Sequence, residues 1–256
     1  MAFPPQLILP LSQHAGKASV CLVRKGQEVA RGEPIARADG FVSVPLHAPA
    51  SGVVKDICLM PSAKGPMVES IVLEVYAGDP QEVLYGTEVD VEKIAVSDIM
   101  QAVQDTGLVG LGGAAFPTHV KLSVPEGCEI DTVLINGCEC EPFLTTDHRL
   151  MVEQAVDLVA GTRILMRALG AKRAIIGTED NKLDAVEAVQ AVLDEEDVVS
   201  VKAVQTKYPQ GAEKMLAKAL VNREIPSGKF PSAVGLGVFN VATATQIGQL
   251  LPKNKG

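Results

Sequence analysis

The chain contains no tryptophan, and only 4% of its 256 residues are aromatic, although 47% are hydrophobic. Its core must therefore be built mainly from valine, isoleucine, leucine and alanine. Basic residues are also in deficit, since the net charge is −8 at pH 7 and the pI is about 5.1. Nucleic-acid binding usually needs a basic surface that neutralises phosphates, so nucleic acid is not an expected partner.

Long apolar runs are missing as well. None approaches the roughly 18 residues that a membrane-spanning helix needs, and Met1–Gln6 lack the features of a signal peptide. We therefore expect a cytosolic chain with no membrane span of its own. The five cysteines contain no C-x-x-C pair, and an odd number without an export signal predicts free thiols. Cys138 and Cys140 alone are too few for a four-ligand site, so no metal site is predicted.

Residues 1–85 are predicted to form a small all-β module. Glycines recur there at turn-like spacing, and short runs that favour β-structure lie between them. These runs are Ala18–Val23, Phe41–Val44, Val53–Cys58 and Ser70–Val75.

Residues 86–248 alternate between apolar strands and helical patterns, which predicts a parallel sheet with right-handed crossovers. The expected strands are Thr132–Ile135, Ala174–Ile176 and Val198–Val204. The expected helices are Ser97–Thr106, Thr145 or Thr146 to about Leu169, Lys182–Leu193 and Ala212–Val221. The stretch from Ile225 is rich in glycine and proline and is expected to be loop-like, with residues 249–256 as a tail.

The most informative segment is a glycine-rich loop between Gly107 and Lys121. Its small residues lack Cβ bulk on one surface, so backbone N–H groups can approach a flat ring or a phosphate. They are Gly110, Gly112, Gly113, Ala114 and Ala115. Phe116 adds an aromatic face and Lys121 a positive charge. The alternative is a mobile loop between domains. The segment is not a Walker loop, because no Gly-Lys-Ser/Thr follows. It also departs from the dinucleotide fingerprint, because it precedes the first clear strand of the sheet.

Polar residues follow the strand Thr132–Ile135 at its carboxyl end, where ligands bind in open parallel sheets. Asn136 can donate and accept hydrogen bonds, and Glu139 and Glu141 can accept from ribose hydroxyls or ring N–H groups. A solvated loop is the alternative.

Two later segments add candidates. Tyr208, Gly211 and Glu213 open a helix, and Gly211 and the helix N-terminus can face an anion. The alternative for Glu213 is an ordinary acid of the first helical turn. Asn240 and Thr243 are suited to holding a phosphate.

The segment Val23–Val54 resembles the barrel-sandwich hybrid fold of lipoyl and biotinyl carriers. It contains the patterns K-G-x-x-V-x-x-G-x-x-I and A-P-x-x-G-x-V. A carrier needs a lysine at the hairpin tip, but no lysine occurs from Gly26 to Val54. A structural or docking role is therefore expected, with His47 as a packing residue.

In their order, the ligand segments resemble the flavin-binding 51-kDa subunit family of respiratory complex I. That family's motifs are roughly G-R-G-G-A-G-F-P-T-G-x-K, N-A-D-E-x-E-P, Y-x-x-G-E-E and x-N-N-V-E-T. This chain departs from them at Leu111, Cys138, Ala212, Phe239 and Ala242. With the barrel-sandwich module and the sequence Pro10–His14, these departures are similar to the C subunit of Rnf electron-transport complexes, over about residues 8–248.

The resemblance implies a Rossmann-like domain that binds FMN without a covalent bond and uses NADH as substrate. FMN carries the hydride chemistry, so no catalytic side chain is expected. The implied FMN-binding residues are Gly110, Gly112, Gly113, Ala114, Lys121, Asn136, Asn240 and Thr243. Glu139, Tyr208 and Gly211 are implied to bind the cofactors, without assignment to one of them. The implied NADH contacts are stacking by Phe116 and hydrogen bonds to Glu141 and Glu213. Cys138, in place of aspartate, removes one expected FMN contact.

The resemblance also implies a place in a larger assembly. The chain would be a peripheral subunit of an ion-translocating NADH:acceptor oxidoreductase at the cytoplasmic face of the cell membrane, with the other Rnf subunits as partners. Family members continue into a domain with two 4Fe–4S clusters, and since no C-x-x-C-x-x-C run occurs in this sequence, a shortened form is expected. The alternatives are a quinone-reductase A subunit, a proline-reductase-associated electron-transfer protein or a non-catalytic docking module.

Overall fold

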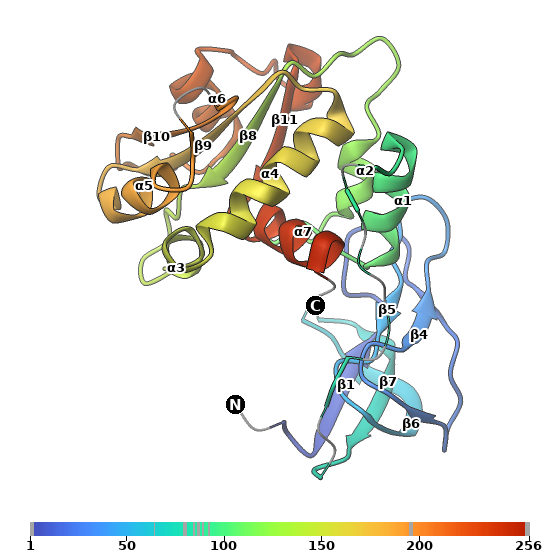
Figure 1. The fold of residues 1–256 in the computed structure, drawn as a ribbon. Helices are drawn as coiled ribbons and strands as arrows, with labels where there is room; N and C mark the ends of the chain where they lie inside the picture. The colour runs from blue at the N-terminus through green and yellow to red at the C-terminus, as the bar shows by residue number, and fades with distance from the viewer. Residues whose placement is uncertain are drawn as a thin grey trace.

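The computed structural model describes residues 3–253 except 64, 79, 80, 84, 86, 87, 89, 92, 195 and 196. Its β-rich N-terminal part lies against one end of an α/β part (Figure 1). The predicted fold class, a barrel-sandwich hybrid module plus a parallel-sheet domain, is confirmed. Within the described residues, no helix is both long enough and apolar enough to cross a bilayer.

The N-terminal module consists of two antiparallel sheets around one apolar core. The four-stranded sheet has the order β1-β7-β6-β3, and the three-stranded sheet has the order β2-β4-β5. The strands are β1 (Gln6–Pro10), β2 (Val20–Cys21), β3 (Glu28–Val29), β4 (Pro34–Arg37), β5 (Leu46–His47), β6 (Gly52–Pro61) and β7 (Met67–Val75). Ile35, Val54 and Ile71 are buried between the sheets.

Three of the four predicted β-runs in this module contain strands, namely β2, β6 and β7. The fourth, Phe41–Val44, forms no strand. It instead contacts the second part of the chain, through Phe41. The shorter strands β1, β3, β4 and β5 lie outside the predicted runs.

The α/β part is built on a four-stranded parallel sheet with the order β10-β9-β8-β11. Its strands are β8 (Thr132–Gly137), β9 (Arg173–Glu179), β10 (Val199–Val204) and β11 (Leu236–Asn240). Its helices are α1 (Val96–Asp105), α2 (Thr118–Leu122), α3 (Thr146–Glu153), α4 (Ala155–Leu169), α5 (Leu183–Gln190), α6 (Glu213–Val221) and α7 (Val241–Lys253), with a 3₁₀ turn at Pro231–Val234.

Successive side chains of β8 point to opposite faces of the sheet, and helices cover both faces. Val133 and Ile135 pack in the cluster that contains α1, α4, α5 and α7, whereas Leu134 packs in the cluster with α6. A strand with both faces buried is apolar throughout, as Thr132–Ile135 nearly is. Figure 1 shows α4 and α7 crossing on one side of the sheet and α6 on the other.

The predicted loop-like tail after Ile225 is wrong. The glycine- and proline-rich stretch ends at Gly235, which has a φ of 75°, and β11 and α7 follow directly. Leu236 and Val238 are buried, and β11 pairs in parallel with β8. Glycines of α4 and α7 then let the two helices touch, because a Cβ at Gly161 would lie 1.8 Å from the Ala244 carbonyl oxygen. This contact fixes the position of the α7 N-terminus.

The single long helix predicted to end near Leu169 is two helices. The chain leaves helical geometry at Gln154, where φ is −132° and ψ is 32°, so that α3 and α4 meet at an angle. The predicted end is correct, since Gly170 closes α4 in the left-handed conformation.

Candidate functional site

The site lies at the carboxyl ends of β8 and β11. Within the sheet, β9 and β10 lie on one side of β8, and the later strand β11 lies on its other side. The strand order therefore reverses between β8 and β11, which makes this a topological switch point. Ligands in open α/β sheets bind at such points. Asn136 at the end of β8 and Asn240 at the end of β11 are partners in register.

A cavity of about 160 Å³ opens there, lined by four segments that are distant in sequence. They are the glycine-rich loop, the end of β8, the start of α6, and the junction between β11 and α7. The lining residues are Gly110, Gly112, Gly113, Ala114, Phe116, Thr118, Lys121, Asn136, Gly211, Glu213, Val238, Phe239, Asn240 and Thr243. Eleven of the fourteen predicted site residues are among them.

The glycine-rich loop is closed on itself and tied to α7. The Gly110 N–H donates to the Phe116 carbonyl at 2.8 Å, and the Leu111 N–H donates to Thr243 Oγ1 at 3.0 Å. Gly112 faces Asn240 so closely that a Cβ there would lie 3.2 Å from the Asn240 Cβ. Bulk at Gly112 would therefore fill space between the loop and β11.

The N-terminal module braces the far end of this loop. The Ala15 N–H donates to the Ala115 carbonyl at 3.0 Å, and Ala115 has a φ of 48°, which non-glycine residues seldom adopt. Buried His119 Nε2 lies 2.8 Å from the Phe41 carbonyl oxygen, and the two rings pack edge to face with centroids 5.6 Å apart. The module thus contacts the segment that forms the cavity wall.

Lys121 is a cation of the cavity wall. Its Nζ lies 3.4 Å from Glu213 Oε1 and 3.3 Å from the Val238 carbonyl oxygen, and 6.0 Å from the centroid of the Phe239 ring. The ion pair is partly exposed and contributes little to stability. Lys121 and Glu213 are therefore available to exchange partners with a ligand.

The turn after β8 is bound to the start of α6. Asn136 Nδ2 donates to the Gly211 carbonyl at 2.8 Å, and the Gly211 N–H donates to Cys140 Sγ at 3.0 Å. A Cβ at Gly211 would lie 2.7 Å from the Cys138 carbonyl oxygen, so the close approach requires glycine. Burial raises the pKa of the Cys138 thiol to about 12, which keeps it protonated and unreactive at neutral pH.

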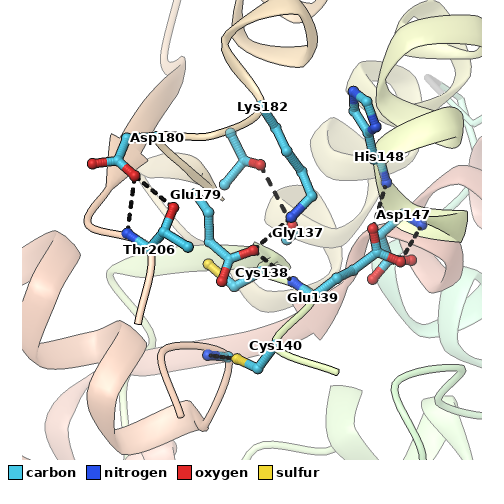
Figure 2. Close-up of polar contacts among 12 residues, drawn as sticks. Gly137, Cys138, Glu139, Cys140, Asp147, His148, Glu179, Asp180, Lys182 and Thr206 are labelled. Carbon is cyan, nitrogen blue, oxygen red and sulfur yellow. Dashed lines mark hydrogen bonds and ion pairs between the residues drawn. The ribbon is translucent and has the colours of Figure 1, made fainter. Parts of the chain in front are cut away.

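Glu139 is not among the residues that line the cavity, and its expected ligand contact remains a prediction. Its carboxylate accepts the Asp147 N–H at 2.9 Å and the His148 N–H at 3.0 Å, which caps the first turn of α3 (Figure 2). Its own N–H donates to Glu179 Oε2 at 3.3 Å, and Glu179 forms a buried ion pair with Lys182 at 2.6 Å. Glu139 therefore holds the turn against β9 and α3.

Glu141 and Tyr208 also lie outside the cavity wall, and both are exposed. Tyr208 is 81% exposed. Their expected ligand contacts remain predictions. Three lining residues, Thr118, Val238 and Phe239, are absent from the predicted set. Thr118 belongs to the F-P-T part of the loop motif, so its position there is a usable signal.

Sequence reasoning also misses Asp147. This residue is buried, and its Oδ2 accepts a hydrogen bond from Asn240 Nδ2 at 2.6 Å. Burial raises the pKa of Asp147 to about 6, although the Asn240 amide opposes the shift. An aspartate in the first turn of a helix is ordinary, so no local pattern indicates that it contacts a residue 93 positions away.

No group of three or more histidine, cysteine, aspartate or glutamate side chains among the described residues is arranged to hold a metal ion. The five cysteines are free thiols, as predicted.

Two family models match the chain. The RnfC barrel sandwich hybrid domain matches residues 1–77, and the Nuo51 FMN-binding domain matches residues 103–249, more than half of the chain. Both matches agree with the two parts of the fold.

Three curated relatives carry names of the same kind. The C subunit of the Na⁺-translocating ferredoxin:NAD⁺ oxidoreductase complex of Acetobacterium woodii is 43% identical over 96% of this chain and 56% of its own length. The corresponding subunit of the proton-translocating complex of Clostridium ljungdahlii is 41% identical over 95% and 53%. The C subunit of the ion-translocating oxidoreductase complex of Pectobacterium atrosepticum is 38% identical over 96% and 36%. The chain thus spans from about a third to somewhat over half of these relatives.

Two solved structures are similar to part of this chain. Both are of an NAD⁺-reducing NiFe-hydrogenase, one in the H₂-reduced and one in the air-oxidised state, each 26% identical. Their TM-scores are 0.51 and 0.53, over 64% and 61% of this chain and 33% and 30% of the hydrogenase chains.

Proposed function

Because the chain belongs to the Nuo51 FMN-binding domain family and, through both of its parts, to the Rnf C-subunit branch, we propose that its cavity binds FMN without a covalent bond and exchanges reducing equivalents with NAD(H). The observation that carries this proposal is the meeting of the small-residue loop with Asn136 and Asn240 at the switch point of the sheet.

The wall of the cavity fits such a cofactor in three respects. Gly112 leaves a space that a Cβ would narrow against Asn240. Gly113, with a φ of 133°, has an open face where no described atom lies within 4 Å of a built Cβ. Thr118 Oγ1 is buried in the wall and has no hydrogen-bond partner among the described residues. A flat ring beside the loop and a polar group near Thr118 would use these features.

Each wall residue has a distinct proposed role. Gly110, Gly112, Gly113 and Ala114 leave room for backbone contact with the flavin, and Asn136 hydrogen-bonds to it. Asn240 and Thr243, at the N-terminus of α7, hold the phosphate, where the helix dipole favours negative charge.

Further residues are assigned to charge balance and to the second substrate. Lys121 balances negative charge on the flavin ring or phosphate. Phe116 stacks on the nicotinamide nucleotide, while Glu213 and the exposed Glu141 accept hydrogen bonds from it. When bound, FMN supplies the hydride and single-electron chemistry, and the chain's part is to orient it and the nucleotide.

The relatives' names support a place in a larger assembly. We propose that the chain is a peripheral, cytoplasmic-side component of a membrane-bound, ion-translocating Rnf complex, where it contacts the other subunits. Electrons would leave FMN for iron–sulfur clusters elsewhere in the complex. The alternatives, a quinone-reductase A subunit or a proline-reductase-associated electron-transfer protein, would share the front module and parts of the glycine-rich loop.

Titration of the purified chain with FMN, followed by quenching of flavin fluorescence, tests the cofactor assignment. Gly112→Val should weaken FMN binding by about tenfold or more, since a lost contact of roughly 1.4 kcal/mol has that effect. Gly78→Val is the matched control, because a Cβ at Gly78 meets no described atom within 4 Å. Wild-type protein that does not bind FMN would leave a non-catalytic docking module as the better interpretation.

A further inference from the structure

Asp147 lies directly behind a residue of the cavity wall. Asn240 Nδ2 donates to Asp147 Oδ2 at 2.6 Å, and Asn240 Oδ1 accepts the Ala242 N–H at 2.8 Å. Both ends of the Asn240 amide are therefore fixed, one by a carboxylate and the other by the first turn of α7. The second N–H of the amide can still face a ligand, since an amide nitrogen carries two protons.

The carboxylate of Asp147 is also close to the α7 N-terminus. Asn240 links the two, because its Nδ2 donates to Asp147 Oδ2 and its Oδ1 accepts the Ala242 N–H in the first turn of α7, where the helix dipole is positive. Asp147 is only 9% exposed, and solvent screens its charge poorly. Any anion that binds beside Asn240 and Thr243 must share this helix end with it.

Burial leaves Asp147 titratable near neutral pH, and the charged groups around it act in opposite directions. Burial is the main reason that its pKa rises to about 6; the charge of Glu139 adds to the rise, and that of Lys182 opposes it. The Cys138 thiol stays neutral because its pKa is about 12. The neighbouring His148 imidazole is paired with Asp184, at 2.9 and 3.0 Å.

We infer that the negative charge of Asp147 opposes a phosphate held by Asn240 and Thr243, so that binding of FMN is coupled to uptake of a proton by Asp147. This inference rests on the proposed cofactor. If a bound phosphate makes ionisation of Asp147 harder, ionisation of Asp147 must by linkage weaken phosphate binding by the same factor. Affinity for FMN then rises as the pH falls and Asp147 becomes neutral.

The dissociation constant of FMN, measured between pH 5 and pH 8 on the whole chain, tests the coupling. The FMN phosphate itself titrates in this range, so the informative quantity is the ratio of wild type to Asp147→Asn. The amide oxygen of the substituted side chain can still accept from Asn240, but without charge. At pH 8 the variant should bind FMN more tightly than wild type, about tenfold for each unit by which bound phosphate raises the pKa of Asp147. At pH 5 the two should agree.

Glu153→Gln is the matched control, because it removes one negative charge from the same helix at an exposed position. It should leave the ratio near one at every pH. The inference is overturned if Asp147→Asn binds FMN equally well or more weakly at pH 8, which would mean that Asp147 only orients Asn240.

Calorimetry of the wild type provides a test that does not depend on the variant folding. FMN binding measured in buffers of different ionisation enthalpy should show more proton uptake near pH 7 than the phosphate alone explains. Riboflavin, which lacks the phosphate, should show none. Equal uptake for both ligands contradicts the coupling, whereas failure of FMN to bind at any pH refutes the cofactor assignment itself.

Discussion

Among single residues, burial decides what each acid near the end of β8 can do. Glu139 is held by two N–H groups of α3, Glu141 two positions later is exposed, and Glu179 is buried against Lys182. The Glu179 and Lys182 side chains are 2% and 10% exposed. Glu179 of this pair also accepts the Glu139 N–H, which holds the turn that follows β8 and its Asn136.

Removing one member of the buried pair should be costly. Lys182→Met leaves the Glu179 carboxylate buried without its cation, which typically destabilises a protein by about 3–5 kcal/mol. Lys218→Met is the matched control, because Lys218 pairs with Glu224 at the surface and such pairs contribute about 0–1 kcal/mol. Urea unfolding of both variants provides the comparison. Equal losses would show that the buried pair does not anchor this turn.

Among the elements of the fold, the barrel-sandwich module supports the glycine-rich loop. It has no lysine at the carrier position, yet its backbone reaches Ala115 through Ala15 and His119 through Phe41. Ala115 has a φ of 48°, which costs energy for a residue with a Cβ and needs support from its surroundings. Support of the loop is therefore a role that this module can fill although it has the fold of a carrier domain and lacks the carrier lysine.

Loss of the contact between the module and the glycine-rich loop should lower FMN affinity more than it lowers the stability of the fold. His119→Ala removes the hydrogen bond to the Phe41 carbonyl and the ring contact. A buried hydrogen bond and its packing contribute about 1–2 kcal/mol. If that energy holds the loop in its binding conformation, FMN affinity should fall roughly tenfold. His148→Ala, whose ring pairs with surface Asp184, is the control. If His119→Ala lowers the melting temperature but leaves FMN binding unchanged, the module serves stability alone.

Local patterns and long-range contacts differ in what can be predicted from sequence. Strands β8 and β9 are predictable because each contains a compact apolar run, and β10 because valines recur along it. The loop residues are predictable because their spacing matches a known motif. Strand β11 is missed because its apolar positions follow a stretch dominated by glycine and proline. The contacts of Asp147 with Asn240 and of Glu139 with Glu179 span 93 and 40 positions, and no local pattern encodes them.

Across the molecule as a whole, the cavity forms only because distant parts meet. The module positions the loop, the α4–α7 contact positions Asn240 and Thr243, and the start of α6 is tied to the turn after β8. No single segment supplies the site. The affinity for a flavin that binds there should therefore depend on the integrity of both parts of the chain.

Anaerobic addition of NADH to the FMN-loaded chain, followed through the visible absorption band of the flavin, probes the proposed function itself. The proposal predicts rapid bleaching in the wild type, and slower bleaching with weaker NADH dependence in Glu213→Gln, whose carboxylate lines the cavity beside Lys121. Protein that binds FMN tightly but is not bleached by NADH would contradict the claim that this cavity brings the two together.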